Sequence, residues 1–176
     1  MEIRSSTILR LRDALLESGA RQGSVSSSAY RTLFSRKMLT KAENAAIERV
    51  AASAESMFLV IAADLQVTQS ELIALRGAVR GLSSEVLSDD IVQLMMEQYA
   101  DQLREDGLDQ RLQAIAATLD ATEAQNVFSL AAAVALADGE FVAEENAVIE
   151  KMKRAYGLTD AQVSAIIGEL QQDPVA

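Results

Sequence analysis

The chain has 176 residues and a formal net charge of −10, and it contains no cysteine and no histidine. Without these two residue types the chain cannot form disulfides, structural zinc sites, iron–sulfur clusters, or Ser-His-Asp and Cys-His catalytic centres. Any metal site must use oxygen ligands, which favours Ca²⁺, Mg²⁺ or Mn²⁺. Apolar residues make up 49% of the chain, and Pro174 is its single proline. This composition predicts an ordinary hydrophobic core in a fold that is nearly all helical.

The two ends of the chain differ sharply in charge. Residues 1–41 contain eight Lys or Arg and three Asp or Glu, whereas residues 42–176 contain eight and twenty-three. An acidic body disfavours nucleic acid as a partner. The basic end could contact an anionic surface, a protein partner or the acidic body itself, and docking on the body is the simplest of these interpretations.

The first predicted element is a short amphipathic helix over residues 5–17. Its apolar residues recur at helical spacing: Ile8, Leu11, Leu15 and Leu16. The Gly/Ser-rich stretch 18–28 predicts a flexible linker, and a second short helix follows over 28–37. We therefore divide the chain into a basic helical extension with its linker, residues 1–39, and an all-helical domain, residues 40–176.

Basic and aromatic side chains of the extension form a candidate partner-binding set. Tyr30 and Phe34 are spaced four residues apart among basic residues, a pattern that suits RNA or a membrane surface. Two aromatic residues are too few for a base-stacking platform, so docking or protein binding is the favoured interpretation. The candidate residues are Arg10, Arg12, Tyr30, Arg31, Phe34, Arg36 and Lys37.

Capping boxes mark the starts of the later helices. In this motif a Thr side chain and a Glu or Gln three residues later satisfy free backbone N–H groups. The spacing occurs four times, at Thr40–Glu43, Thr68–Glu71, Thr122–Gln125 and Thr159–Gln162. With the apolar periodicity, these signals predict helices over 41–63, 69–80, 84–105, 109–119, 123–137, 143–156 and 160–171.

An internal repeat organises these helices. Residues 58–83 parallel residues 130–159, with Asp64 aligned to Asp138 and Glu71 aligned to Glu145. Each copy reads as a helical hairpin that cannot bury its apolar face alone. The expected fold is therefore all-α, a compact bundle of about seven helices built from two repeated helical hairpins, plus an N-terminal helical extension.

Four carboxylates in the second copy are the candidate metal ligands: Asp138, Glu140, Glu144 and Glu145. Gly139 permits a tight turn that could bring such acids together around a divalent cation. The stretch lacks the alternating acids of an EF-hand loop. A structural role is the favoured alternative, because Glu145 aligns with the capping position of Glu71 and acids suit the first turn of a helix.

The stretch ALADGEFVAEENAVIEKMKRAYGLT resembles the tellurite-resistance TerB-like family. That family's pattern is an Ala-rich helix, Ala-Asp-Gly, acids, a Glu-Glu pair and a helix that ends in Gly-Leu. The resemblance extends over roughly residues 40–172, and Leu65 departs from it by replacing the counterpart of Gly139. It implies a compact helical domain of a family with no established catalytic activity, found in stress-response systems, often beside membrane partners. The family's acids have been proposed to bind divalent cations.

We therefore expect a non-enzymatic interaction protein whose acidic body binds a partner protein. The alternative is a divalent-cation sensor of a tellurite-resistance or stress response that uses the turn from Asp138 to Glu145. A carboxylate-based hydrolase is the weakest interpretation, because the sequence has no phosphate loop or positioned base. The expected location is cytoplasmic, with the basic N-terminus as a means of peripheral attachment to the inner membrane. Self-association is left open, and no nucleic acid is expected.

Overall fold

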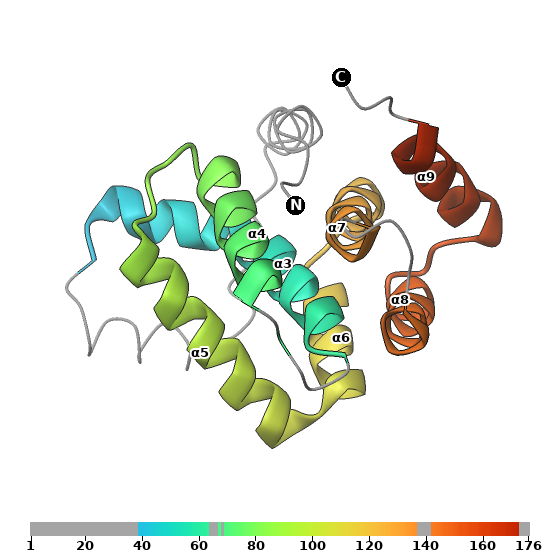
Figure 1. Ribbon diagram of the computed structural model, residues 1–176, viewed down its shortest axis with the longest axis horizontal. Coiled ribbons are helices and arrows are strands. Elements are labelled where there is room, and N and C mark those ends of the chain that lie inside the picture. The colour runs from blue at the N-terminus through green and yellow to red at the C-terminus, as the bar shows by residue number, and fades with distance from the viewer. Residues whose placement is uncertain (1–38, 64–66, 68, 137–141, 173–176) are drawn as a thin grey trace.

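The computed structural model describes residues 39–63, 67, 69–136 and 142–172 (Figure 1). In this part of the chain there are seven helices and no strand, which confirms the all-α prediction. The helices are α3 (Lys41–Ile61), α4 (Gln69–Leu82), α5 (Asp89–Asp106), α6 (Leu108–Ala116), α7 (Ala121–Ala135), α8 (Ala143–Ala155) and α9 (Asp160–Gln172). Both helices predicted before residue 38 lie outside the described residues.

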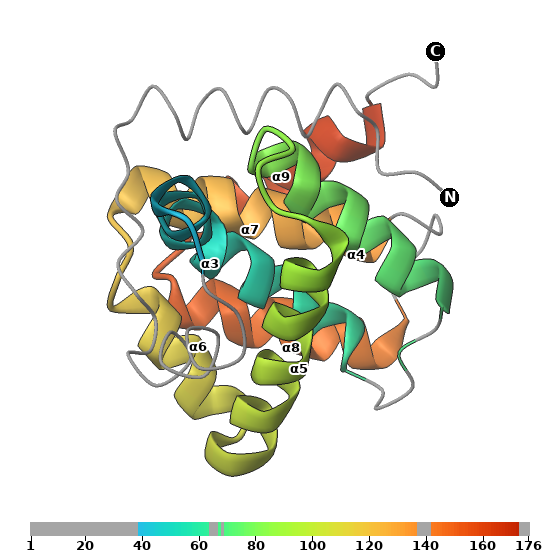
Figure 2. The same ribbon diagram turned by 90° about the vertical axis from the view of Figure 1, so that its left-hand side faces the viewer.

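Helix α3 is the centre of the bundle. Every side chain from Val50 to Ile61 is buried, so this stretch is covered on all sides. Most residues of this stretch are apolar, and a helix with apolar side chains around its whole circumference belongs in the interior of a fold. Helix α3 accordingly packs most extensively against α7 and also contacts α4, α5, α6 and α8, an arrangement visible in Figures 1 and 2.

Two of the predicted capping boxes are present. The Thr40 hydroxyl accepts a bond from the Glu43 N–H at 3.1 Å, and Glu43 accepts one from the Thr40 N–H at 2.7 Å. At the start of α9, Gln162 accepts from the Thr159 N–H at 2.8 Å, and the Thr159 hydroxyl accepts from the Gln162 N–H at 3.2 Å. The spacing of the capping residues therefore predicted these two helix starts correctly.

The predicted box at Thr122 and Gln125 is wrong. Helix α7 begins two residues earlier, where Asp120 accepts from the Glu123 N–H and Glu123 accepts from the Asp120 N–H, each at 2.8 Å. An Asp caps at least as well as a Thr, so the earlier match prevails. Residue Thr68 of the remaining box lies outside the described residues.

The predicted start of α5 at residue 84 is also wrong. Ser84 and Glu85 have φ angles of 54° and 61°, which no α-helix accommodates. The helix begins instead after Ser88, whose hydroxyl accepts from the Ile91 N–H at 3.4 Å. Leu87 precedes the helix but is buried, so it matches the apolar pattern of α5 and led to a predicted start that is too early.

Helices α4 and α8 begin on the same side of the bundle. Helices α3 and α4 contact each other, as do α7 and α8. Both α4 and α8 begin on the side that faces the viewer in Figure 1 and lies to the right in Figure 2. The descent of the two pairs from one repeated hairpin stays a prediction. No helix among the described residues is long and apolar enough to span a membrane.

Candidate functional site

The structure assigns a local role to one of the four predicted metal ligands. Glu145 is the third residue of α8, and its carboxylate accepts a bond from the Val142 backbone N–H at 3.1 Å. This geometry confirms the expected capping position. Glu144 is exposed in the same first turn. Asp138 and Glu140 lie outside the described residues.

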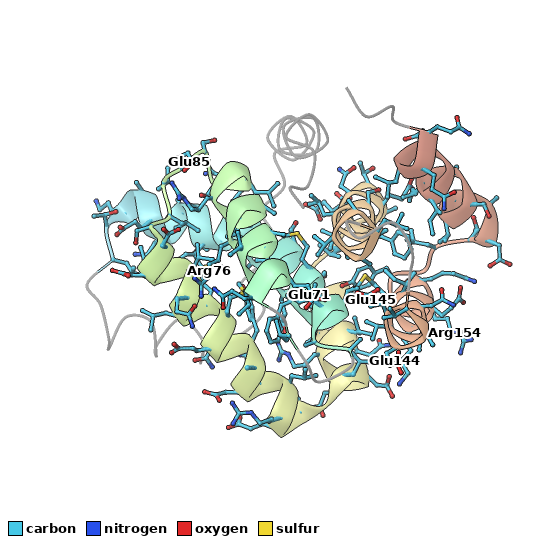
Figure 3. All side chains as sticks on the ribbon, viewed as in Figure 1. Glu71, Arg76, Glu85, Glu144, Glu145 and Arg154 are labelled. Atoms are coloured by element: carbon cyan, nitrogen blue, oxygen red, sulfur yellow. The ribbon has the colours of Figure 1, made fainter. Side chains whose placement is uncertain are left out.

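The starts of α4 and α8 contain both acids and exposed apolar side chains. Figure 3 shows Glu71 on α4 and Glu144 and Glu145 on α8, and both helices begin on the same side of the molecule. Ile73, two residues after Glu71, is 60% exposed, and Val142, the N-cap residue of α8, is 49% exposed. We call these five residues the turn face.

The described residues contain only part of the predicted cation site. Among the described residues, no three His, Cys, Asp or Glu side chains are grouped so that they could hold a metal ion. Two of the four predicted ligands, Glu144 and Glu145, belong to these residues, and the Glu145 carboxylate already accepts a backbone bond. A cation at this turn stays a prediction that depends on Asp138 and Glu140.

The predicted partner-binding residues of the extension all lie outside the described residues. They are Arg10, Arg12, Tyr30, Arg31, Phe34, Arg36 and Lys37. Their role in binding a protein or an anionic surface also stays a prediction.

A buried ion pair joins α3 to α6, and sequence reasoning missed it. The Arg111 guanidinium donates to both carboxylate oxygens of Glu55, at 2.7 and 3.0 Å, and its third nitrogen donates to Asp106 at 3.0 Å. The side chains of Glu55 and Arg111 are only 1% and 5% exposed. The pair is buried away from solvent and joins two helices, which assigns it a structural role.

Burial dominates the electrostatics of this pair. It raises the pKa of Glu55 above its ordinary value, although the hydrogen bonds and charge of Arg111 oppose the shift. Burial lowers the pKa of Arg111, but the hydrogen bonds and negative charges of Glu55 and Asp106 outweigh it and leave that pKa raised. The pair is thus held together at a substantial desolvation cost.

The next residue of α3 makes a second buried polar contact. The hydroxyls of Ser56 and Tyr156 lie 2.5 Å apart, and Tyr156 is the C-cap residue of α8. Burial raises the pKa of Tyr156, the Ser56 hydrogen bond opposes this, and the negative charge of Glu55 adds to it. One signal for both contacts was available in the sequence, namely a Glu-Ser pair inside the apolar run from Val50 to Ile61.

The comparisons with known proteins give one match. The family model described as "Tellurite resistance protein TerB" matches residues 48–167. No curated protein and no solved structure matches the chain. The matched range begins within the central helix α3 and contains the buried ion pair and the turn face.

Proposed function

Because the chain belongs to the TerB family, we propose that it acts without catalysis, by binding a protein partner at the turn face. The family's description links it to tellurite resistance, so a stress-response complex is the setting that we propose. The observation that carries the proposal is the exposure of two large apolar side chains, Ile73 and Val142, near the starts of two helices that begin on the same side of the bundle.

Exposed apolar residues are unusual on the described part of this domain. Three large apolar side chains are more than a third exposed there: Ile73, Val86 and Val142. Single exposed residues need no explanation, but two near helix starts on the same side of the bundle are what a protein-binding surface would present. Helix propensity offers no local reason for Ile73, because a β-branched residue at an exposed helix position is less favourable than Ala.

The chemistry of the turn face indicates the kind of partner. Glu71, Glu144 and Glu145 give it negative charge, and the helix starts α4 and α8 contain no Lys or Arg in their first turns. A partner with a basic rim around an apolar centre would complement it. Charge would then contribute mainly to the rate of association and to specificity, and the buried apolar contacts would contribute most of the affinity.

Matched single substitutions test this proposal. The full chain, Ile73→Ser, Val142→Ser and Val86→Ser would be used to capture proteins from the native host, and captured proteins would be quantified by mass spectrometry. We expect the captured amount of at least one protein to fall about tenfold with Ile73→Ser and with Val142→Ser. Its amount should stay the same with Val86→Ser, because Val86 lies before α5 and outside the turn face. Equal capture by all four proteins would refute the proposal.

Cation binding is a second function that the arrangement favours. Helices α4 and α8 begin on one side of the bundle, and the acids Asp64, Asp138 and Glu140 shortly precede these two starts in the sequence. A cation that binds the folded chain raises its melting temperature by mass action. We expect Mn²⁺ or Ca²⁺ at millimolar concentration to stabilise the chain and Asp138→Asn to abolish the effect, with Asp101→Asn as control. An unchanged melting temperature and no heat in calorimetry would exclude this function.

A further inference from the structure

Helix α9 is attached to the bundle by one apolar stripe. Among its thirteen residues only Val163 is buried, and the other large apolar side chains, Ile166, Ile167 and Leu170, are half-buried against the core. These four positions share one face of the helix. Of the described helices only α7 packs extensively on α9, which lies at the edge of the bundle in Figure 1.

Helix α8 has the same length and is attached more firmly. It buries Val148, Ile149 and Met152, and it packs against α3, α6 and α7. Hydrophobic stabilisation grows with the apolar area removed from water. The segments of a fold that bury least therefore open at the lowest free energy. Among the described helices, α9 is the one expected to open first.

We propose that α9 opens as a separate unit, moving away from α7 while the helices from α3 to α8 stay folded. The end of α8 is closed without α9, because the Leu158 N–H donates to the Lys153 carbonyl at 3.0 Å and Gly157 supplies a φ of 68°. The start of α9 is held by its own capping box, made of Thr159 and Gln162. Rotation of the backbone between these two local structures moves α9 and breaks neither of them.

An ion pair spans the connection between α8 and α9. Lys153 of α8 lies 2.5 Å from Asp160, the first residue of α9, and 3.2 Å from Glu150 of its own helix. Hydrogen bonds to these two acids raise the pKa of Lys153, and the bond to Lys153 lowers the pKa of Asp160. The Asp160 side chain is 88% exposed, and such an exposed pair is weak and is screened by salt. The pair therefore holds α9 closed weakly and reversibly.

The opening controls the exposure of an apolar surface. The stripe of α9 is covered on α7 in the closed form and becomes accessible in the open form. A helix of thirteen residues is only marginally stable alone in water, so its backbone amides become exchangeable at the same time. The turn face belongs to other helices, so the opening is independent of a partner bound there.

Native-state hydrogen exchange of the full chain at low urea concentrations tests the proposal. We expect the amides of α9 to share one opening with a common dependence on urea. They should exchange at least about a hundredfold faster than the most protected amides of α3 and α7. Ile115→Val, at a fully buried position of α6, should speed exchange of those protected amides about two- to tenfold and leave the α9 amides unchanged.

Two outcomes of this experiment would overturn the proposal. Acceleration of the α9 amides by the same factor in Ile115→Val would show that the domain opens as one cooperative unit. Protection that declines steadily along α9 towards Gln172 would show simple fraying of a helix end.

Two lysine variants test the contribution of the ion pair. Lys153→Met removes the pair with Asp160 and should speed exchange of the α9 amides about two- to fivefold. Lys151→Met removes a pair on the same side of the hinge, 2.8 Å from Asp109 of α6, so the α9 amides should keep their rates. Equal α9 rates in the two variants would refute the role of the pair.

Thiol labelling provides an independent measurement, since the chain has no cysteine. Val163→Cys on α9 and Val148→Cys on α8 are matched substitutions at buried positions, which are 9% and 4% exposed. We expect Val163→Cys to react with a thiol reagent at least about a hundredfold faster, at a rate that Ile115→Val does not change. Similar reaction rates at the two positions would overturn the proposal.

Discussion

Removal of Arg111 is expected to be the most damaging single substitution in the described bundle. Arg111→Met leaves the Glu55 carboxylate, which is 1% exposed, without its two guanidinium bonds. Breaking a buried ion pair in this way costs about 3–5 kcal/mol. For a chain of this size each kcal/mol lowers Tm by about 3 °C, so we expect a decrease of about 10–15 °C.

A surface pair and a double substitution provide the controls. Arg104 lies 2.7 Å from Asp101, but these side chains are 75% and 53% exposed, so Arg104→Met should cost less than about 0.5 kcal/mol. Glu55→Leu combined with Arg111→Met removes both buried charges and should recover most of the loss, to within about 1 kcal/mol of the parent chain.

The stability of Arg111→Met should depend on pH in a direction that follows from the pKa of Glu55. Burial already raises the pKa of Glu55 above 4.5, and losing Arg111 raises it further. The folded variant then binds a proton more tightly than the unfolded chain, so its stability is regained as pH falls through the raised pKa towards 4.5. Urea unfolding followed by circular dichroism from pH 8 to pH 5 measures this. A cost no larger than that of Arg104→Met, or a deficit that does not shrink at lower pH, would refute the reasoning.

The remaining predictions concern single positions. Tyr156→Phe removes the hydroxyl contact with Ser56 and should cost about 1 kcal/mol by urea unfolding. Because burial raises the pKa of Tyr156, the parent chain should lose stability as pH rises above 10 and this variant should lose less, as alkaline melting curves can show. Gly107→Ala, at a φ of +79°, should destabilise by about 1 kcal/mol. Gly77→Ala, inside α4 with open space at the Cβ position, should stabilise by about 0.5–1 kcal/mol in the same melts; a reversed order of these two glycine variants would contradict the backbone argument.

The parts of the fold that depend on local spacing were predictable. The starts of α3 and α9 follow from capping boxes closed within four residues, and the role of Glu145 follows from its alignment with Glu71. The start of α5 was not predictable from periodicity, because Ser84 and Glu85 adopt positive φ within a stretch whose apolar pattern continues. Periodicity records which side chains are buried, but it does not record where the backbone reverses.

The buried polar contacts could not be predicted from the sequence, for a different reason. The sequence shows Glu55 inside an apolar run, which indicates that it needs a partner. Its partner Arg111 lies 56 positions away, on a short helix whose sequence gives no sign of the contact. Likewise, the position of the turn face depends on how two helix pairs lie in space, and spacing within one helix carries no such information.

The two adjacent polar residues of α3 also explain how a helix that is buried on all sides takes a single orientation. Apolar packing alone would tolerate small rotations of α3, because every direction around it is covered. Glu55 and Ser56 point about 100° apart around the helix axis, and they are bonded to α6 and to the end of α8, respectively. These contacts resist rotation of α3, and α4 packs against α3, so a rotation of α3 would displace α4. We therefore expect Glu55→Leu with Arg111→Met to retain its stability but to show broadened amide resonances at Glu71 and Ile73, whereas sharp, unshifted resonances there would show that packing alone positions the turn face.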